Sequence, residues 1–282
     1  MILRRIEIIL LGLCCCFSVF ASENDSIKVE RWLQEASILS KDSCRTLHFA
    51  KKMLGVPYVA GTLDANDEES LVVHLDKVDC TTLVETVLAL AIAEKQKEGN
   101  AFTNFKNALA FIRYREGKLD GYSSRLHYFS DWIKDNECKG IAEETTSKSL
   151  CAQKQELWLD FMSTHSESYL PMKKDSSLIQ QIATQEKALQ GILVSYIPKE
   201  KLNLPPCDLK IENGDILAIT TNIKGLDVVH VGFAYWLGET LHMLHASSVA
   251  NKVIMDNQSL YDYSKNKKAH TGVRAIRFVY NR

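Results

Sequence analysis

Two kinds of hydrophobic pattern follow one another along the chain. Apolar residues first recur with the spacing of amphipathic helices. The segments are residues 42–54, 80–93 and 102–112. Alternation of apolar and polar residues, typical of half-buried strands, begins only after residue 206. These segments are residues 215–220, 228–236, 240–246 and 275–280. Helices first and strands last predict an α+β domain in which the helix at 80–93 packs on a mostly antiparallel sheet.

A long segment separates the last predicted helix from the first predicted strand. Residues 117–206 mix helical stretches with polar loops. This is more chain than a crossing from helix to sheet requires. We therefore predict that residues 22–282 form a single domain with a helical insertion at about 117–206.

The N-terminus has the features of an export signal. MILRR is followed by an apolar run at 6–20 and by Ala21, after which the sequence is polar. A charged start, a short apolar stretch and a small residue at the cut are typical of a secretory signal peptide. The run is shorter than the roughly 20 residues of a membrane span. We predict a signal peptide at 1–21, export, and no stable membrane span after processing. A retained helix and a lipid anchor at Cys14, Cys15 or Cys16 are the alternatives.

Composition and charge narrow the class of protein. Hydrophobic residues make up 46% of the chain, which is enough for a sizeable core and excludes a disordered chain. Lysine and arginine number 34 against 35 aspartates and glutamates, for a net charge of −1. This balance gives no sign of the electropositive surface that non-specific nucleic-acid binding requires, so no nucleic-acid partner is expected.

Export changes how the cysteines are interpreted, because thiols can pair in an oxidising compartment. Cys44, Cys80, Cys138, Cys151 and Cys207 follow the predicted signal peptide, and an odd number leaves at least one unpaired. We predict that Cys80 is unpaired. Cys138 and Cys151 flank a short polar stretch and are the candidate disulfide, which would stabilise by roughly 3 kcal/mol. Two unpaired thiols are the alternative.

Cys80 has the setting of a nucleophile. Asp79 is a good helix N-cap, which places Cys80 in the first turn of the helix that follows. The free N–H groups and the helix dipole at that end should lower the cysteine pKa and can also bind an oxyanion. A buried structural cysteine is the alternative.

A thiolate nucleophile needs a proton acceptor, and the acceptor needs an orienting partner. His230 lies in a predicted strand and shares its face with Gly232 and Ala234, whose small side chains would let the catalytic helix approach. His242 and His245 lie on opposite faces of the next strand, so only one can point at the site. We choose His245, at the strand end, as the orienting residue.

Three blocks together resemble the NlpC-type papain-like cell-wall hydrolases. They are GVPY at 55–58 with DC at 79–80, HVG at 230–232 and LHA at 244–246. The resemblance implies a papain-like core with Cys80 as nucleophile, His230 as base, His245 as orienting residue and Tyr58 lining the site. No cofactor and no metal are expected.

A narrower resemblance covers most of the mature chain. It is carried by DCTT at 79–82, GYSSRLHYFSDW at 121–132 and DILAI at 215–219. These resemble a branch long classed as a domain of unknown function, whose members are similar to N-acetylmuramoyl-L-alanine amidases acting on anhydro-muropeptides. The resemblance implies a muropeptide or peptidoglycan-fragment substrate in the periplasm. The wider superfamily commonly has DCSG where this chain has DCTT, so the pocket beside the thiolate should differ.

The predicted insertion carries side chains suited to such a substrate. Aromatic faces suit sugars or peptides, and an arginine suits the free carboxylates of muropeptides. We predict that the insertion closes one end of the cleft, so that soluble fragments enter and the sacculus does not. Anchoring of the insertion is the alternative role, chiefly for Tyr128 and Trp132. The predicted substrate contacts are Tyr58, Tyr122, Arg125, His127 and Asp131.

Other functions stay open at this point. A zinc amidase would use His230, His242 and His245, although the opposite faces of the last two make a shared metal awkward. A non-catalytic wall-binding module is a second alternative. The amide that is cut is a further choice, between the muramoyl–L-alanine bond and the γ-D-glutamyl bond to the diamino acid.

Overall fold

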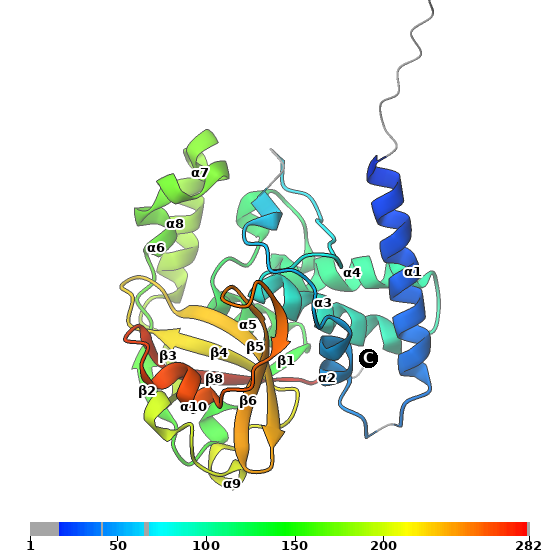
Figure 1. Cartoon of the computed structure of the whole chain (residues 1–282). Coiled ribbons are helices and arrows are strands. Elements are labelled where there is room, and N and C mark those ends of the chain that lie inside the picture. The colour runs from blue at the N-terminus through cyan, green and yellow to red at the C-terminus, as the bar shows by residue number, and fades with distance from the viewer. Residues whose placement is uncertain (1–16, 41, 65–67, 281–282) are drawn as a thin grey trace, which may run out of the picture.

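The computed structural model describes residues 17–40, 42–64 and 68–280. An antiparallel sheet lies at its centre, in the order β2-β3-β8-β4-β5-β6-β7, and β1 pairs with β8 (Figure 1). The strands of this sheet are β1 (Ala142–Glu144), β2 (Gln153–Glu156), β3 (Leu193–Pro198), β4 (Ile216–Thr221), β5 (Val228–Leu237), β6 (Thr240–Ser247), β7 (Lys252–Met255) and β8 (His270–Phe278).

Helices pack on both faces of the sheet. They are α1 (Phe17–Ser37), α2 (Arg45–Lys52), α3 (Cys80–Lys95), α4 (Ala101–Arg113), α5 (Phe129–Cys138), α6 (Phe161–Thr164), α7 (Leu170–Lys174), α8 (Ser177–Leu189), α9 (Pro206–Leu209) and α10 (Leu260–Lys265). The buried α3 joins one face, where Val231 and Phe233 of β5 belong to the same core. Leu260 of α10 packs on the other face, with Ala234. The fold is therefore α+β, as predicted.

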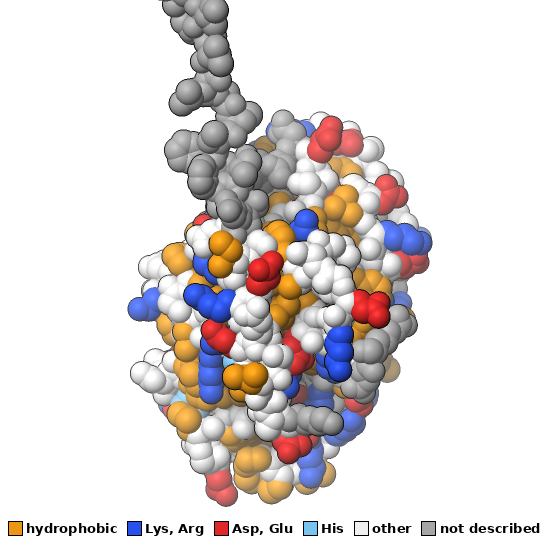
Figure 2. All heavy atoms as spheres, turned by 90° about the vertical axis from the view of Figure 1, so that its right-hand side faces the viewer, with side chains coloured by type: hydrophobic (Ala, Val, Ile, Leu, Met, Phe, Trp, Pro, Cys, Tyr) orange, Lys and Arg blue, Asp and Glu red, His pale blue; other side chains and the backbone are white. Residues whose placement is uncertain are grey.

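The helical pattern located α2, α3 and α4 correctly but missed α1. This helix packs through Val29, Trp32 and Ala36 on the helical side of the core. On the α1 side, acidic, basic and hydrophobic side chains are interspersed (Figure 2). Among the described residues, no helix has both the length and the apolar character of a membrane span. Residues 1–16, most of the predicted signal peptide, lie outside the described part.

The predicted insertion is not purely helical, which corrects the prediction for residues 117–206. Helices α5 to α8 lie there, but so do β1, β2 and β3, and both β1 and β3 pair with β8. The segment thus extends the central sheet. These strands are short, and β2 has the polar sequence QKQE with no buried residue, so its pattern gives no alternation to detect. A small core of its own, which includes Leu157, Met162 and Ile182, holds α6, α7 and α8, whereas α5 packs in the main core through Phe129 and Trp132.

Two local features shape the region around β5. Gly238, with φ of 60°, lies in the two-residue turn that joins β5 to β6, where a glycine is favoured. The register between β4 and β5 shifts between Ile219 and Thr220, so that Ile219 pairs with His230 and Thr220 with Val228. Such bulges bend a strand and redirect a side chain. This one lies directly at His230.

Candidate active site

Cys80 is the first residue of α3, as predicted. The Asp79 carboxylate accepts a hydrogen bond from the backbone N–H of Thr82 at 2.8 Å, and the Thr82 hydroxyl accepts one from the Asp79 N–H at 2.8 Å. This reciprocal capping box fixes the start of the helix. The Cys80 side chain is partly buried against the main core and is a free thiol.

The charge state of Cys80 differs from the expectation. Burial, followed by the Asp79 carboxylate, raises the pKa of Cys80 to about 11. Hydrogen bonds to the sulfur from the Val231 backbone and from Thr81 only oppose this rise. The prediction of a lowered pKa is wrong, because desolvation of the thiolate outweighs the helix terminus. Near neutral pH the thiol of the free protein keeps its proton.

His230 and His245 meet on the α10 side of the sheet. Nε2 of His230 lies 2.6 Å from Nδ1 of His245, and Nε2 of His245 lies 3.4 Å from Oδ2 of Asp256. If His245 donates to Asp256, its Nδ1 accepts the His230 Nε2–H, which leaves Nδ1 of His230 as a free base. The geometry thus brings His245, rather than His242, to His230.

Gly232 has a different role from the one expected. It belongs to the face opposite to Val231 and Phe233, which pack with α3. A Cβ at Gly232 would lie 2.7 Å from the Leu244 carbonyl and 2.8 Å from the His245 Cβ. The small residue therefore makes room for β6 and His245, not for the helix.

Both imidazoles are held neutral. Burial lowers the pKa of His230 to about 3, with further lowering by His245, Lys267 and His270. Burial also lowers the pKa of His245, although Asp256 opposes the shift. A neutral imidazole can accept a proton, which an imidazolium cannot.

Tyr263 of α10 lies near both histidines and interacts electrostatically with Cys80. Its ring centroid lies 6.4 Å from that of His230 and 5.6 Å from that of His245. The Lys267 ammonium lies 3.2 Å from the same ring. Burial, with smaller contributions from Asp256 and Cys80, raises the pKa of Tyr263 to about 12.

Cys80 lies close to the start of β5. The Val231 backbone, one residue after His230, hydrogen-bonds the sulfur. The residue pairs between β5 and β6 run from Leu237–Thr240 to Phe233–Leu244. Residues 228–232 of β5, which include His230, therefore lie outside this paired stretch. Tyr58, which pairs with Val78 in an isolated bridge, also interacts electrostatically with Cys80. The predicted Cys80, His230, His245 and Tyr58 are thus brought together.

Three of the predicted substrate contacts line one hollow of about 190 Å³ next to Cys80. Its lining includes Thr81 and Asp79 from the start of α3, together with Tyr122, Arg125 and His127. The Tyr122 and His127 rings are 4.4 Å apart, and the Arg125 guanidinium lies 4.9 Å from the Tyr122 ring. We call this the α3 hollow.

Arg125 is not a free cation. It is 6% exposed and ion-paired with Asp64, and its Nε lies 3.7 Å from Oε1 of Glu69. That Nε is buried and has no hydrogen-bond partner among the described residues. Burial lowers the pKa of His127 to about 3, so this ring is neutral.

Asp131 lies elsewhere. Its carboxylate pairs with Arg115 through contacts of 3.1 and 2.5 Å, and both line a separate hollow with Cys138. Asp131 is therefore not among the residues brought to Cys80.

The predicted Cys138–Cys151 disulfide is wrong, since both thiols are free. Between them, β1 and the following turn run along β8, where the Thr145 N–H donates to the Ala275 carbonyl at 2.9 Å. Cys138 lines the hollow beside α8, whereas Cys151 packs against the core that contains Leu260 of α10. The intervening segment thus takes the two cysteines to different parts of the molecule.

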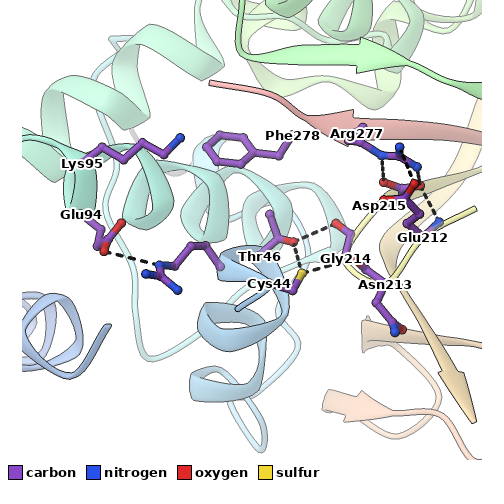
Figure 3. A pocket seen from close by; sticks show the side chains of 11 residues that line it. Cys44, Thr46, Glu94, Lys95, Glu212, Asn213, Gly214, Asp215, Arg277 and Phe278 are labelled. Carbon is purple, nitrogen blue, oxygen red and sulfur yellow. Dashed lines mark hydrogen bonds and ion pairs between the residues drawn. The ribbon is translucent and has the colours of Figure 1, made fainter. Parts of the chain in front are cut away.

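A larger hollow, of about 420 Å³, lies at the other end of α3 (Figure 3). Its charged groups already pair with one another, as in Arg45 with Glu94 and Arg277 with Asp215. The Cys44 thiol donates a hydrogen bond to the Asn213 carbonyl and shares one with the Thr46 hydroxyl, each at 3.2 Å. No histidine is among the residues that line this hollow.

The residues of the zinc alternative do not converge. His242 stacks on Tyr235 with ring centroids 5.3 Å apart, on the side of the sheet opposite to His245. In the described segments, no group of three or more His, Cys, Asp and Glu side chains is arranged to hold a metal ion.

Sequence reasoning missed Asp256, Tyr263 and Lys267. Asp256 follows β7 directly, and an acidic residue at a strand end next to a histidine strand was the available signal. Tyr263 and Lys267 gave none, because their place depends on how α10 packs across the sheet.

Comparison with known proteins places the chain in a family. A family model described as N-acetylmuramoyl-L-alanine amidase-like matches residues 48–273. A Bacteroides fragilis structure provisionally named a xylanase is 44% identical, with a TM-score of 0.77 over 82% of this chain and 99% of that one. An N-acetylmuramoyl-L-alanine amidase from Bacteroides uniformis is 38% identical, with a TM-score of 0.79 over 84% and 100%.

A Legionella pneumophila protein, LPG0564, shares the fold at 23% identity, with a TM-score of 0.72 over 93% of this chain and 97% of that one. No curated protein matches the chain. The family match spans most of the sequence, including Cys80, His230 and His245. The chain therefore belongs to the N-acetylmuramoyl-L-alanine amidase-like family.

Proposed function

We propose that this protein is a cysteine amidase of peptidoglycan fragments. It cleaves the amide between (anhydro-)N-acetylmuramic acid and L-alanine through a thioester on Cys80, in a papain-like arrangement of helix and sheet. Two observations support the proposal. The Val231 backbone, next to His230, hydrogen-bonds the sulfur of Cys80 at the start of α3. His230, His245 and Asp256 form a chain of contacts. Family membership supports the substrate class.

The pKa shifts of Cys80 and His230 favour general-base activation of a neutral thiol over a preformed thiolate–imidazolium pair. Because the thiol is protonated and His230 is neutral, His230 takes the proton as the sulfur attacks the carbonyl carbon. The resulting oxyanion lies within reach of the free N–H groups in the first turn of α3. His245 and Asp256 orient His230 and stabilise its transient positive charge.

The remaining steps return the groups to their starting state. His230 gives its proton to the nitrogen of the leaving L-alanine, and the C–N bond breaks to leave a thioester. Water then attacks the thioester carbon while His230 accepts a proton. Collapse releases the muramic acid carboxylate, and Cys80 regains its proton.

The substrate is a soluble fragment in this proposal. The α3 hollow carries Tyr122, Arg125 and His127 from the segment after α4. In this proposal that segment limits access, so that soluble fragments enter and the sacculus does not. We also propose export to the periplasm, where such fragments arise, which cell fractionation of the tagged protein would test. Arg125 contributes positive charge through a network that already includes Asp64.

Mass spectrometry of products from one defined anhydro-disaccharide-tetrapeptide tests the function. Release of a peptide that begins with L-alanine is expected. A sugar that keeps an L-alanyl-D-glutamate stub would assign the γ-D-glutamyl endopeptidase activity instead. Absence of turnover by the wild type would indicate a binding module. Loss of activity with a chelator but not with a thiol reagent would favour a metal mechanism.

A further inference from the structure

A second hollow adjoins the α3 hollow. Residues 155–160 form one wall and residues 221–226 the other, around a volume of about 240 Å³. We call this the Trp158 groove. Trp158 is 61% exposed, whereas Trp32 and Trp132 are buried and Trp236 donates its indole N–H to the Ile211 carbonyl at 3.0 Å. An exposed tryptophan in a hollow is unusual and favours a binding role.

The groove is held in place before any ligand arrives. Leu157 and Leu159, on either side of Trp158, are 3% and 1% exposed and anchor the segment in the small core. Alternation along this extended stretch therefore turns Trp158 outward. Across the groove, Gly225 pairs with Leu159, and its carbonyl accepts the N–H groups of Asp160 at 3.2 Å and Phe161 at 3.1 Å.

Gly225 allows this close approach of the two walls. Its φ is 79°, and a Cβ there would lie 2.1 Å from Oδ1 of Asp160 and 2.9 Å from the Phe161 nitrogen. A side chain would therefore separate the walls. A rigid platform loses little conformational entropy on binding, which favours recognition of a small rigid ligand.

The chemistry of the groove is that of a platform with a polar rim. Trp158 and the 39% exposed Ile223 present apolar surface. The polar lining residues are Gln155, Glu156, Asp160, Thr221, Asn222 and Lys224. A pyranose ring has apolar C–H faces and hydroxyl groups around its edge, so it fits an aromatic face that is surrounded by hydrogen-bonding groups.

The groove also lies where the sugar of a fragment would extend. Leu226 lines both the Trp158 groove and the α3 hollow, so the two are direct neighbours. In the proposed reaction the muramoyl group is the acyl part, and the sugar attached to it continues away from the cut amide. We propose that the Trp158 groove binds the N-acetylglucosamine ring of a disaccharide-peptide. This inference rests on the proposed function for the identity of the substrate.

Kinetics with two substrates tests the inference. The substrates share one peptide, and one carries N-acetylglucosaminyl-anhydro-muramoyl while the other carries anhydro-muramoyl alone. Trp158→Ala should lower kcat/KM about tenfold for the disaccharide and less than about twofold for the monosaccharide. Trp158→Phe should recover most of the loss. Leu237→Ala removes an equally exposed apolar side chain, at 57%, outside both hollows, and should change neither value.

A binding measurement separates this inference from the proposed function. The Cys80→Ala variant is titrated with N,N′-diacetylchitobiose while its tryptophan fluorescence is followed. A saturable change that disappears in Cys80→Ala/Trp158→Ala is expected, and it would support the groove even if the wild type cut neither substrate. Equal losses of kcat/KM on both substrates, or a fluorescence titration unaffected by Trp158→Ala, would overturn the inference.

Discussion

The His230 and His245 rings meet nearly edge to face, at 86°, with 2.6 Å between Nε2 of the first and Nδ1 of the second. Asp256 lies at the far nitrogen of His245. In the proposed mechanism a neutral histidine takes the orienting place that an amide or carboxylate fills in known triads. His230, His245 and Asp256 therefore hold different positions along one chain of contacts, and substitutions at the three should have different effects.

Cys80→Ala and His230→Ala should each abolish turnover, with kcat at least about a thousandfold lower, because in the proposed mechanism both act as one unit in forming and resolving the thioester. Product formation is followed by mass spectrometry, and circular dichroism checks that each variant folds. A rate within a few-fold of the wild type in either variant would exclude the mechanism.

His245→Ala should lower kcat less severely, by about ten- to a hundredfold, because His245 orients the base without reacting. His242→Ala is the control, since His242 lies on the opposite face against Tyr235, and its Nδ1 lies 3.1 Å from the backbone carbonyl of Asp256 rather than contacting the carboxylate. It should leave kcat within about threefold. A larger loss in His242→Ala than in His245→Ala would show that the orienting residue is misassigned.

Asp256→Asn keeps the backbone carbonyl that accepts from the Tyr235 hydroxyl, but removes the negative charge. The His245 pKa should fall, because the Asp256 carboxylate opposes its lowering by burial. A His230 imidazolium then loses support, so kcat should fall about tenfold while KM changes little. Stopped-time assays over a range of concentrations of one defined substrate measure kcat and KM separately. Unchanged kcat would remove Asp256 from the relay.

Arg125→Ala should destabilise the protein as well as lower kcat/KM. It leaves Glu69 buried without its nearby guanidinium, which costs roughly 3 kcal/mol. Arg115→Ala is the control, because its partner Asp131 lies outside the α3 hollow. That variant should keep kcat/KM. Urea unfolding and steady-state kinetics on both variants separate stability from binding, and equal kinetics in the two would contradict a role of Arg125 in the site.

The buried His270 should weaken the fold in acid. Burial first, then Lys267 and Lys199, lower its folded pKa to about 4, below the ordinary value of about 6.5. Between these values the unfolded chain binds more protons, so this contribution to stability is full above pH 6.5 and is lost as pH falls toward 4. Relative to His270→Asn, the wild type should therefore lose urea-midpoint stability from pH 7 to pH 4.5. A constant difference between the two proteins would show that the shift is absent.

The sequence by itself determined the candidate site residues and the order of elements. The apolar spacing that located α3, the N-cap Asp79 and the strand patterns of β5 and β6 depend on residues a few positions apart, so they can be read without coordinates. The predicted one-sided stripe of α3 is wrong, because residues 82–93 are all buried. Alternation likewise separated His242 from His245. The short polar strand β2 and the helix α1 escaped detection, because one is a sheet-edge segment with no buried residue and the other had no predicted partner.

Only the tertiary structure decided the charges and the neighbours. The helix terminus favoured a thiolate at Cys80, but burial by segments distant in sequence raises its pKa instead. The sequence predicts Arg125 as a free cation, but in the structure it is ion-paired with Asp64. Asp131 lies in the same sequence block as Arg125, but its carboxylate pairs with Arg115. Asp256 and Tyr263 reach the histidines through the packing of β7 and α10. Desolvation and pairing depend on long-range packing, whereas periodicity and capping depend on residues a few positions apart.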